Sequence, residues 1–126
     1  MNRKAELKKL IKCMEKGWKL LPANPTNGTN GDGRTNACPL IHAVIGYVGS
    51  YHYGQYDIDC VHYGRYTITR AESLFPILTK QMVDDVRITQ YCSKTSDLVD
   101  AIITLADRYC WTTLEVIEWL RTHQED

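Results

Sequence analysis

Hydrophobic residues recur at helical spacing in two stretches of the N-terminal half. Residues 3–21 alternate apolar and basic positions with a period near 3.6, which predicts an amphipathic helix that Pro22 ends. Its apolar stripe consists of Leu7, Leu10, Ile11, Met14, Trp18 and Leu21. The second stretch carries a stripe of Leu40, Ile41, Val44, Ile45 and Val48. Pro39 suits a first helical turn, so this stretch is predicted to be the central core helix.

The segment between these helices is polar. Residues 22–37 contain Asn27-Gly28, Asn30-Gly31 and Asp32-Gly33, which are typical turn dipeptides. The segment therefore predicts a flexible surface loop within a single domain that spans residues 1–126.

A period of two appears after the core helix. Residues 56–61 alternate and predict a strand, residues 62–65 a turn, and residues 66–68 a returning strand. Such a small hairpin would have to pack on the helices, because an isolated hairpin is marginally stable. Residues 84–91 alternate as well and predict a third short strand.

Capping patterns predict the remaining helices. Thr69 with Glu72 forms a capping box, and Pro76 should shorten the helix that it opens. Ser96 is the predicted cap of the next helix, and Thr112 with Glu115 is a capping box for the last one. The predicted fold is α+β: a mostly helical domain of four to five helices with a small β-hairpin.

Composition indicates a soluble protein of the cytoplasm. No apolar run in the 126 residues approaches a membrane span, and the charged N-terminal segment does not match a signal peptide. The five cysteines show no CxxC spacing, which favours reduced thiols. Charge is segregated: residues 1–21 hold seven Lys and Arg against two Glu, and residues 71–126 hold five against ten Asp and Glu. The bland interpretation of this segregation is solubility, and the alternative is steering of partners.

One candidate chemistry is that of a small cysteine-dependent hydrolase. Cys38 lies at the predicted start of the core helix, where the helix N-terminus would favour its thiolate. His62 is the candidate base and Asp59 the orienting carboxylate, with His52 and Asp57 as substitutes. The spacing does not identify a triad, and a buried structural thiol is the simpler interpretation.

A zinc site is a second candidate chemistry. Its ligands would be Cys38, His42, Cys60 and His62. Their spacing matches no finger or knuckle pattern, so no metal and no cofactor is predicted. The last two helices resemble a helix-turn-helix in outline, but Glu115 and Glu118 on the second would repel phosphates. The sequence therefore argues against specific DNA binding.

Tyrosines interleaved with histidines follow the core helix, in residues 47–66. Tyrosine supplies a large contact area at low entropy cost and stacks on bases, although some of these rings could be core. The predicted binding residues are Tyr51, His52, Tyr53, Tyr56, Tyr63 and Arg65. The predicted partner is a protein or a nucleotide-like ligand.

Two places resemble a family of small uncharacterised bacterial and phage proteins. In that family a cysteine opens a central apolar helix, as in residues 38–43, and a C-terminal pattern resembles residues 105–107 with 112–116. His42 stands where the family has glycine, and its tryptophan before Asn-Asp is missing. The resemblance covers about a third of the chain and implies only a fold, since the family's function is unknown. The predicted function is that of a non-enzymatic interaction protein, for example a phage-encoded accessory factor or inhibitor; the alternative is the Cys38 hydrolase.

Overall fold

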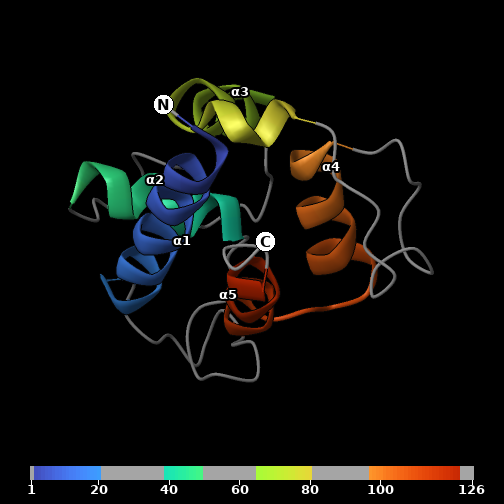
Figure 1. The fold of residues 1–126 in the computed structure, drawn as a ribbon. Coiled ribbons are helices and arrows are strands. Elements are labelled where there is room, and N and C mark those ends of the chain that lie inside the picture. Colours follow the sequence, from blue (N-terminus) through green and yellow to red (C-terminus); the bar gives the residue numbers. More distant parts are fainter. Residues whose placement is uncertain (1, 21–38, 50–64, 81–96, 123–126) are drawn as a thin grey trace.

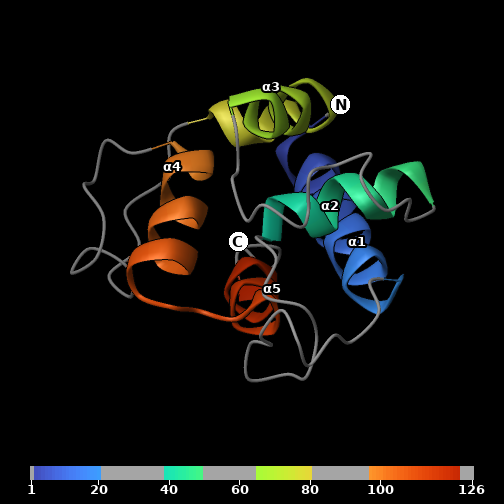
Figure 2. The same cartoon turned by 180° about the vertical axis from the view of Figure 1, so that it is seen from behind.

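The computed structural model describes residues 2–20, 39–49, 65–80 and 97–122, and these segments form an assembly of helices (Figure 1). The elements are α1 (Arg3–Leu20), α2 (Pro39–Val48), α3 (Arg65–Leu74), the 3₁₀ turn η2 (Pro76–Thr79), α4 (Leu98–Ile103), the π-helical turn η3 (Thr104–Arg108) and α5 (Thr113–Thr122). Helix α2 crosses α1, and α3 lies over the N-terminal end of α1. Helix α4 lies on the side of α5 that is away from α1 (Figures 1 and 2).

The predicted α+β class is wrong, because the described part of the chain is helical and contains no strand. The error can be located in residues 66–68, which were expected to return as the second strand of a hairpin but lie in the first turn of α3. Ile68, Ala71 and Phe75 follow helical spacing, and Ala71 and Phe75 are buried. Packing of this apolar stripe therefore overrides the β propensity of a short Tyr-Thr-Ile sequence. The other predicted strand segments, 56–61 and 84–91, lie outside the described residues, as does the predicted loop 22–37.

The two N-terminal helices agree with the apolar pattern. Helix α1 ends at Leu20 and buries four members of its predicted stripe: Leu7, Leu10, Ile11 and Met14. Helix α2 begins at Pro39, and eight of its ten residues are buried. The prediction that it is the central core helix is confirmed.

Helices α1 and α2 touch backbone to backbone through two glycines. A Cβ atom added to Gly17 would lie 1.6 Å from the carbonyl oxygen of His42, and one added to Gly46 would lie 1.7 Å from that of Cys13. Real Cβ atoms do not approach this closely, so only glycine permits the crossing at either position. The pair fixes how deeply the core helix sits against α1.

Helix α5 has the predicted N-terminal cap, whereas the cap of α4 is Asp97 and not the predicted Ser96. Thr112 and Glu115 form the predicted capping box, with backbone-to-side-chain distances of 2.9 and 3.1 Å. The cap of α4 is Asp97, whose carboxylate accepts a hydrogen bond from the Asp100 amide at 3.1 Å. The chain leaves η3 through Cys110, whose φ of 57° is the left-handed conformation common at helix ends. As predicted, Pro76 shortens α3 and begins a 3₁₀ turn. The predicted capping box of Thr69 and Glu72 is wrong, because α3 begins at Arg65 and both residues lie inside it.

One hydrophobic cluster joins every helix. Its largest fully buried side chains include Leu78 of η2, Ile102 of α4 and Ile117 of α5, together with Phe75 at the junction of α3 and η2. None of the helices in the described segments combines the length and apolar character needed to cross a lipid bilayer.

Candidate functional site

Most residues predicted to carry function lie outside the described part of the chain. These are Cys38, Tyr51, His52, Tyr53, Tyr56, Asp57, Asp59, Cys60, His62 and Tyr63. Arg65 is described as the first residue of α3, and His42 as a residue of α2. The candidate triad and most of the zinc ligand set therefore stay predictions.

His42 is completely buried where α2 meets the start of α5. Its Nδ1 atom lies 2.8 Å from Oγ1 of Thr113, which is also buried. A hydrogen bond between buried side chains is worth more than one at the surface, since breaking it strands a desolvated polar atom. In this position His42 ties the core helix to α5.

The strongest candidate for a recognition surface is a pocket beside Tyr47, at the end of α2. The Tyr47 side chain is 48% exposed, whereas Phe75, which it contacts, is 1% exposed. The two rings meet edge to face, with centroids 5.8 Å apart and planes at 86°. This geometry is favourable for aromatic pairs, so one side of Tyr47 is held while the rest faces solvent.

Lys9 of α1 fixes the same ring from a third element. Its Nζ donates a hydrogen bond to the carbonyl oxygen of Leu74, at the C-terminus of α3, with a length of 3.1 Å. The ammonium group also lies 4.9 Å from the Tyr47 ring centroid and 5.5 Å from that of Phe75. A cation is favoured both at a helix C-terminus and over an aromatic face. Lys9 thus joins α1, α2 and α3 at one point.

The Tyr47 pocket has a volume of about 290 Å³ and combines a ring with both signs of charge. It is lined by Glu6, Lys9, Tyr47, Ser73, Leu74, Phe75 and Pro76. A volume of this size is at the small end of ligand pockets, enough for one side chain or one planar ring. The lining offers an apolar contact, a cation and a carboxylate, which suit binding and orientation.

A second concave surface lies on α5 and the turn before it. It has a volume of about 480 Å³ and is lined by Trp111, Leu114, Glu115, Glu118, Trp119 and Thr122. The two tryptophan rings meet edge to face, with centroids 6.5 Å apart. The groove is mainly apolar, and Glu115 and Glu118 give it negative charge.

Two described groups have shifted pKa values, and burial is the main cause of both. Burial raises the pKa of the Cys13 thiol, and it outweighs the opposing effect of Lys9, Lys16 and Lys12. The pKa of Asp100 is raised by desolvation and then by the neighbouring Asp97 carboxylate. Neither shift activates a nucleophile, because a raised thiol pKa leaves less thiolate at neutral pH.

The described residues also contain no cluster of three metal-ligating side chains. Taken together, the described segments form a small helical assembly with an aromatic-lined pocket where α1, α2 and α3 meet. Comparison with family models, with curated proteins and with solved structures found no match to this chain. The function has to be inferred from the geometry, and the resemblance to uncharacterised bacterial and phage proteins stays a prediction.

None of the residues that line the Tyr47 pocket is among the predicted binding residues. Tyr47 belongs to the predicted tyrosine-rich segment, but Lys9 and Phe75 do not. No sequence signal singles out Lys9, because Lys19 also falls outside the series Lys4, Lys8, Lys12 and Lys16. Phe75 gives no such signal either: its place beneath Tyr47 depends on how α3 packs on α2, which no local pattern specifies.

Proposed function

We propose that this chain is a non-enzymatic binding protein that recognises its partner through the Tyr47 pocket and the tyrosine-rich segment that follows it. The observation that carries the proposal is the half-exposed Tyr47 ring, held by Phe75 on one side and by Lys9 on another. An aromatic ring fixed before binding loses little further conformational entropy in a complex. Tyr47 is also the first of the closely spaced tyrosines.

The pocket chemistry supports a protein or a nucleotide-like ligand as the partner. The exposed face of Tyr47 can stack on a base or pack against a partner side chain, and Lys9 adds positive charge. We place such an accessory factor or inhibitor in the cytoplasm, because Cys13 and Cys110 are free thiols. A phage origin is part of the same proposal and rests on the sequence resemblance alone.

The proposal is tested by replacing Tyr47. Tyr47→Ala should abolish capture of the partner from a lysate of the encoding organism, measured by quantitative mass spectrometry, and any thermal shift produced by a panel of nucleotides. Tyr47→Ala should cost about 0.5–1.5 kcal/mol for the edge-to-face pair, in addition to the apolar area and the Lys9 contact of a ring that is only half buried, and the variant should stay folded.

Tyr109→Ala is the matched control. Tyr109 is 40% exposed and lies between η3 and α5, away from the Tyr47 pocket, with Arg108 5.9 Å from its ring centroid. Its replacement should leave partner and nucleotide binding unchanged. If both tyrosine variants bind equally well, or if Tyr47→Ala unfolds the protein, Tyr47 is not a recognition residue.

A further inference from the structure

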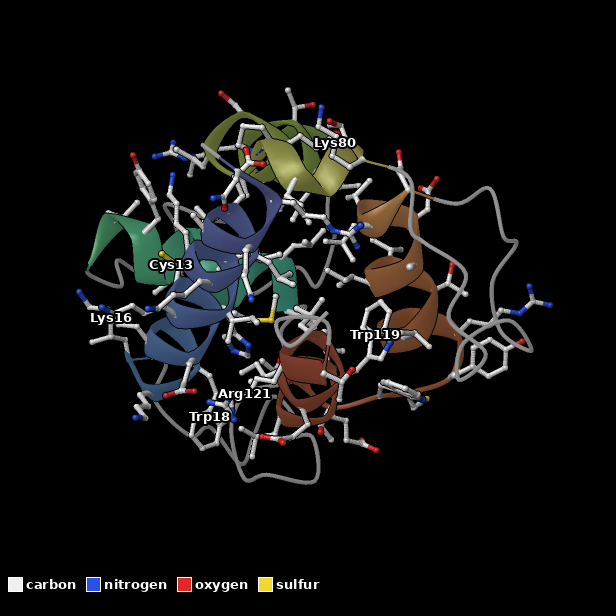
Figure 3. The ribbon with its side chains drawn as sticks, viewed as in Figure 1. Cys13, Lys16, Trp18, Lys80, Trp119 and Arg121 are labelled. Atoms are coloured by element: carbon white, nitrogen blue, oxygen red, sulfur yellow. The ribbon has the colours of Figure 1, made fainter. Side chains whose placement is uncertain are left out.

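Helix α1 has a second surface that neither the core nor the Tyr47 pocket uses. Its apolar stripe is buried against α2 and the rest of the core. The opposite side carries exposed lysines, which we call the lysine row: Lys4, Lys8, Lys12, Lys16 and Lys19. Lys16 projects away from α4 and α5 (Figure 3). Burial of one face therefore forces the positive charge of the helix to the outside.

The lysine row has a regular spacing. Its first four members follow one another every four residues, a rise of about 6 Å per step on an α-helix. From Lys4 to Lys19 the row extends about 22 Å along a rigid helix, which corresponds to roughly six phosphates along one strand of a duplex. Because 3.6 residues complete a turn, each step also rotates by about 40° around the axis, so the lysines form an inclined strip on one side of the helix. Such a strip can follow a polymer of regularly spaced anions.

Little of this charge is cancelled within the described part of the protein. Among those residues the row has one carboxylate contact, from Lys19 to Glu15 at 3.6 Å. Glu15 is also bound by Arg121 of α5, and Trp18 lies near this contact (Figure 3). Glu15 is therefore shared by two cations, and Lys4, Lys8, Lys12 and Lys16 make no carboxylate contact with the described residues.

The same helix disfavours two other anionic partners. A helix that lies on a membrane inserts its apolar face, but in α1 that face is buried in the core. Single-stranded nucleic acid is bound by stacking bases on aromatic rings, and the outward side of α1 bears none: its one aromatic residue, Trp18, belongs to the apolar stripe. A duplex, with its phosphates outside and its bases stacked inside, needs only cations in a row.

We propose that the lysine row binds the phosphate backbone of duplex nucleic acid without sequence preference. This surface is separate from the Tyr47 pocket, and the inference stands whether or not Tyr47 binds a partner. The acidic side chains of α5 would orient the approach by keeping their own side of the molecule away from the phosphates.

The test is fluorescence anisotropy of a labelled duplex oligonucleotide titrated with the full chain at several salt concentrations. If about four phosphates are neutralised, the logarithm of the binding constant should fall with the logarithm of salt with a slope of about −3.6. Lys8→Glu combined with Lys12→Glu should weaken binding by more than about tenfold at low salt and flatten this slope. Lys8→Ala combined with Lys12→Ala should act in the same direction with a smaller effect.

Lys80→Glu is the control for net charge, because it removes two units of positive charge, as the double alanine variant does, at a residue that is exposed at the end of η2, away from the row (Figure 3). It should change the affinity by less than about twofold. Circular dichroism should show the same helical content in all variants, since the replaced lysines are exposed. The proposal is overturned if the wild-type chain does not bind the duplex at low salt, or if Lys80→Glu weakens binding as much as the double variants do. It is equally overturned if a single strand of the same length binds more tightly, or if anionic phospholipid vesicles bind the chain and the duplex does not.

Discussion

Two cysteines among the described residues, Cys13 and Cys110, differ in how far they are buried. Cys13 lies on α1 at the contact with α2, where burial raises the pKa of its thiol. Cys110 is exposed at the turn between η3 and α5. Thiolate is the reactive form, so both the raised pKa and the restricted access protect Cys13.

Alkylation rates should reflect this difference. At slightly alkaline pH iodoacetamide should modify Cys13 at least several-fold more slowly than Cys110, and the Cys13 rate should keep rising as the pH is increased through its raised pKa. Site-resolved mass spectrometry measures both rates in one sample. In denaturant the difference should disappear, because it depends on the fold.

The alkylation rates of Cys13 and Cys110 are also references for the alkylation rate of Cys38. A catalytic Cys38 would react faster than exposed Cys110, because its thiolate would be stabilised. Equal rates for Cys13 and Cys110 in the native protein would contradict the placement of Cys13 at the α1–α2 contact.

Among the elements, the crossing of α1 and α2 determines the position of the core helix. Gly17 faces the backbone of α2 and Gly46 faces that of α1, so neither helix can yield by rotating a side chain. In an unconstrained helix a glycine is about 1 kcal/mol less favourable than alanine. At this crossing the clash of an added Cβ atom with the facing backbone should make alanine less favourable than glycine.

Gly17→Ala should therefore destabilise the protein although it raises helix propensity. We expect a loss of more than about 3 kcal/mol in the free energy of unfolding, measured by denaturant titration, because the new Cβ meets backbone atoms. Lys16→Ala, one residue away and exposed, should change it by less than about 0.5 kcal/mol. A Gly17→Ala variant as stable as the native chain would mean that the helices do not approach this closely.

Element types were predictable wherever an apolar stripe and a cap agreed. The stripe of α1, Pro39 at the start of α2 and the Thr112–Glu115 capping box each identified a helix correctly. The prediction failed at residues 66–68, because three residues carry too little periodicity to distinguish a strand from the first turn of a helix. Long-range packing of Ala71 and Phe75 decides that case.

The site was less predictable than the fold. Sequence composition pointed to the tyrosines, and Tyr47 at their start does face solvent. It did not indicate that Lys9, 38 residues earlier, would lie over that ring. Such a junction depends on how three helices meet, and local patterns contain no information about that arrangement.

At the scale of the whole molecule, positive and negative charge are concentrated on different described segments. Helix α1 presents its lysine row outward, whereas residues 97–122 contain two arginines and five carboxylates. The Tyr47 pocket lies at the junction of α1, α2 and α3, and Arg121 reaches from α5 to Glu15 of α1. The described part of the molecule thus has an aromatic-lined pocket and a separate cationic face.

The central claim, that Tyr47 marks the surface where a partner binds, is tested most directly by photo-crosslinking. A benzophenone amino acid would replace Tyr47 in one variant and Tyr109 in another, and each would be irradiated in a lysate of the encoding organism. The account predicts a discrete adduct from position 47, identified by mass spectrometry, that excess unlabelled native protein suppresses, and no such adduct from position 109. Equal adducts from both positions, or an adduct from position 109 alone, would contradict it.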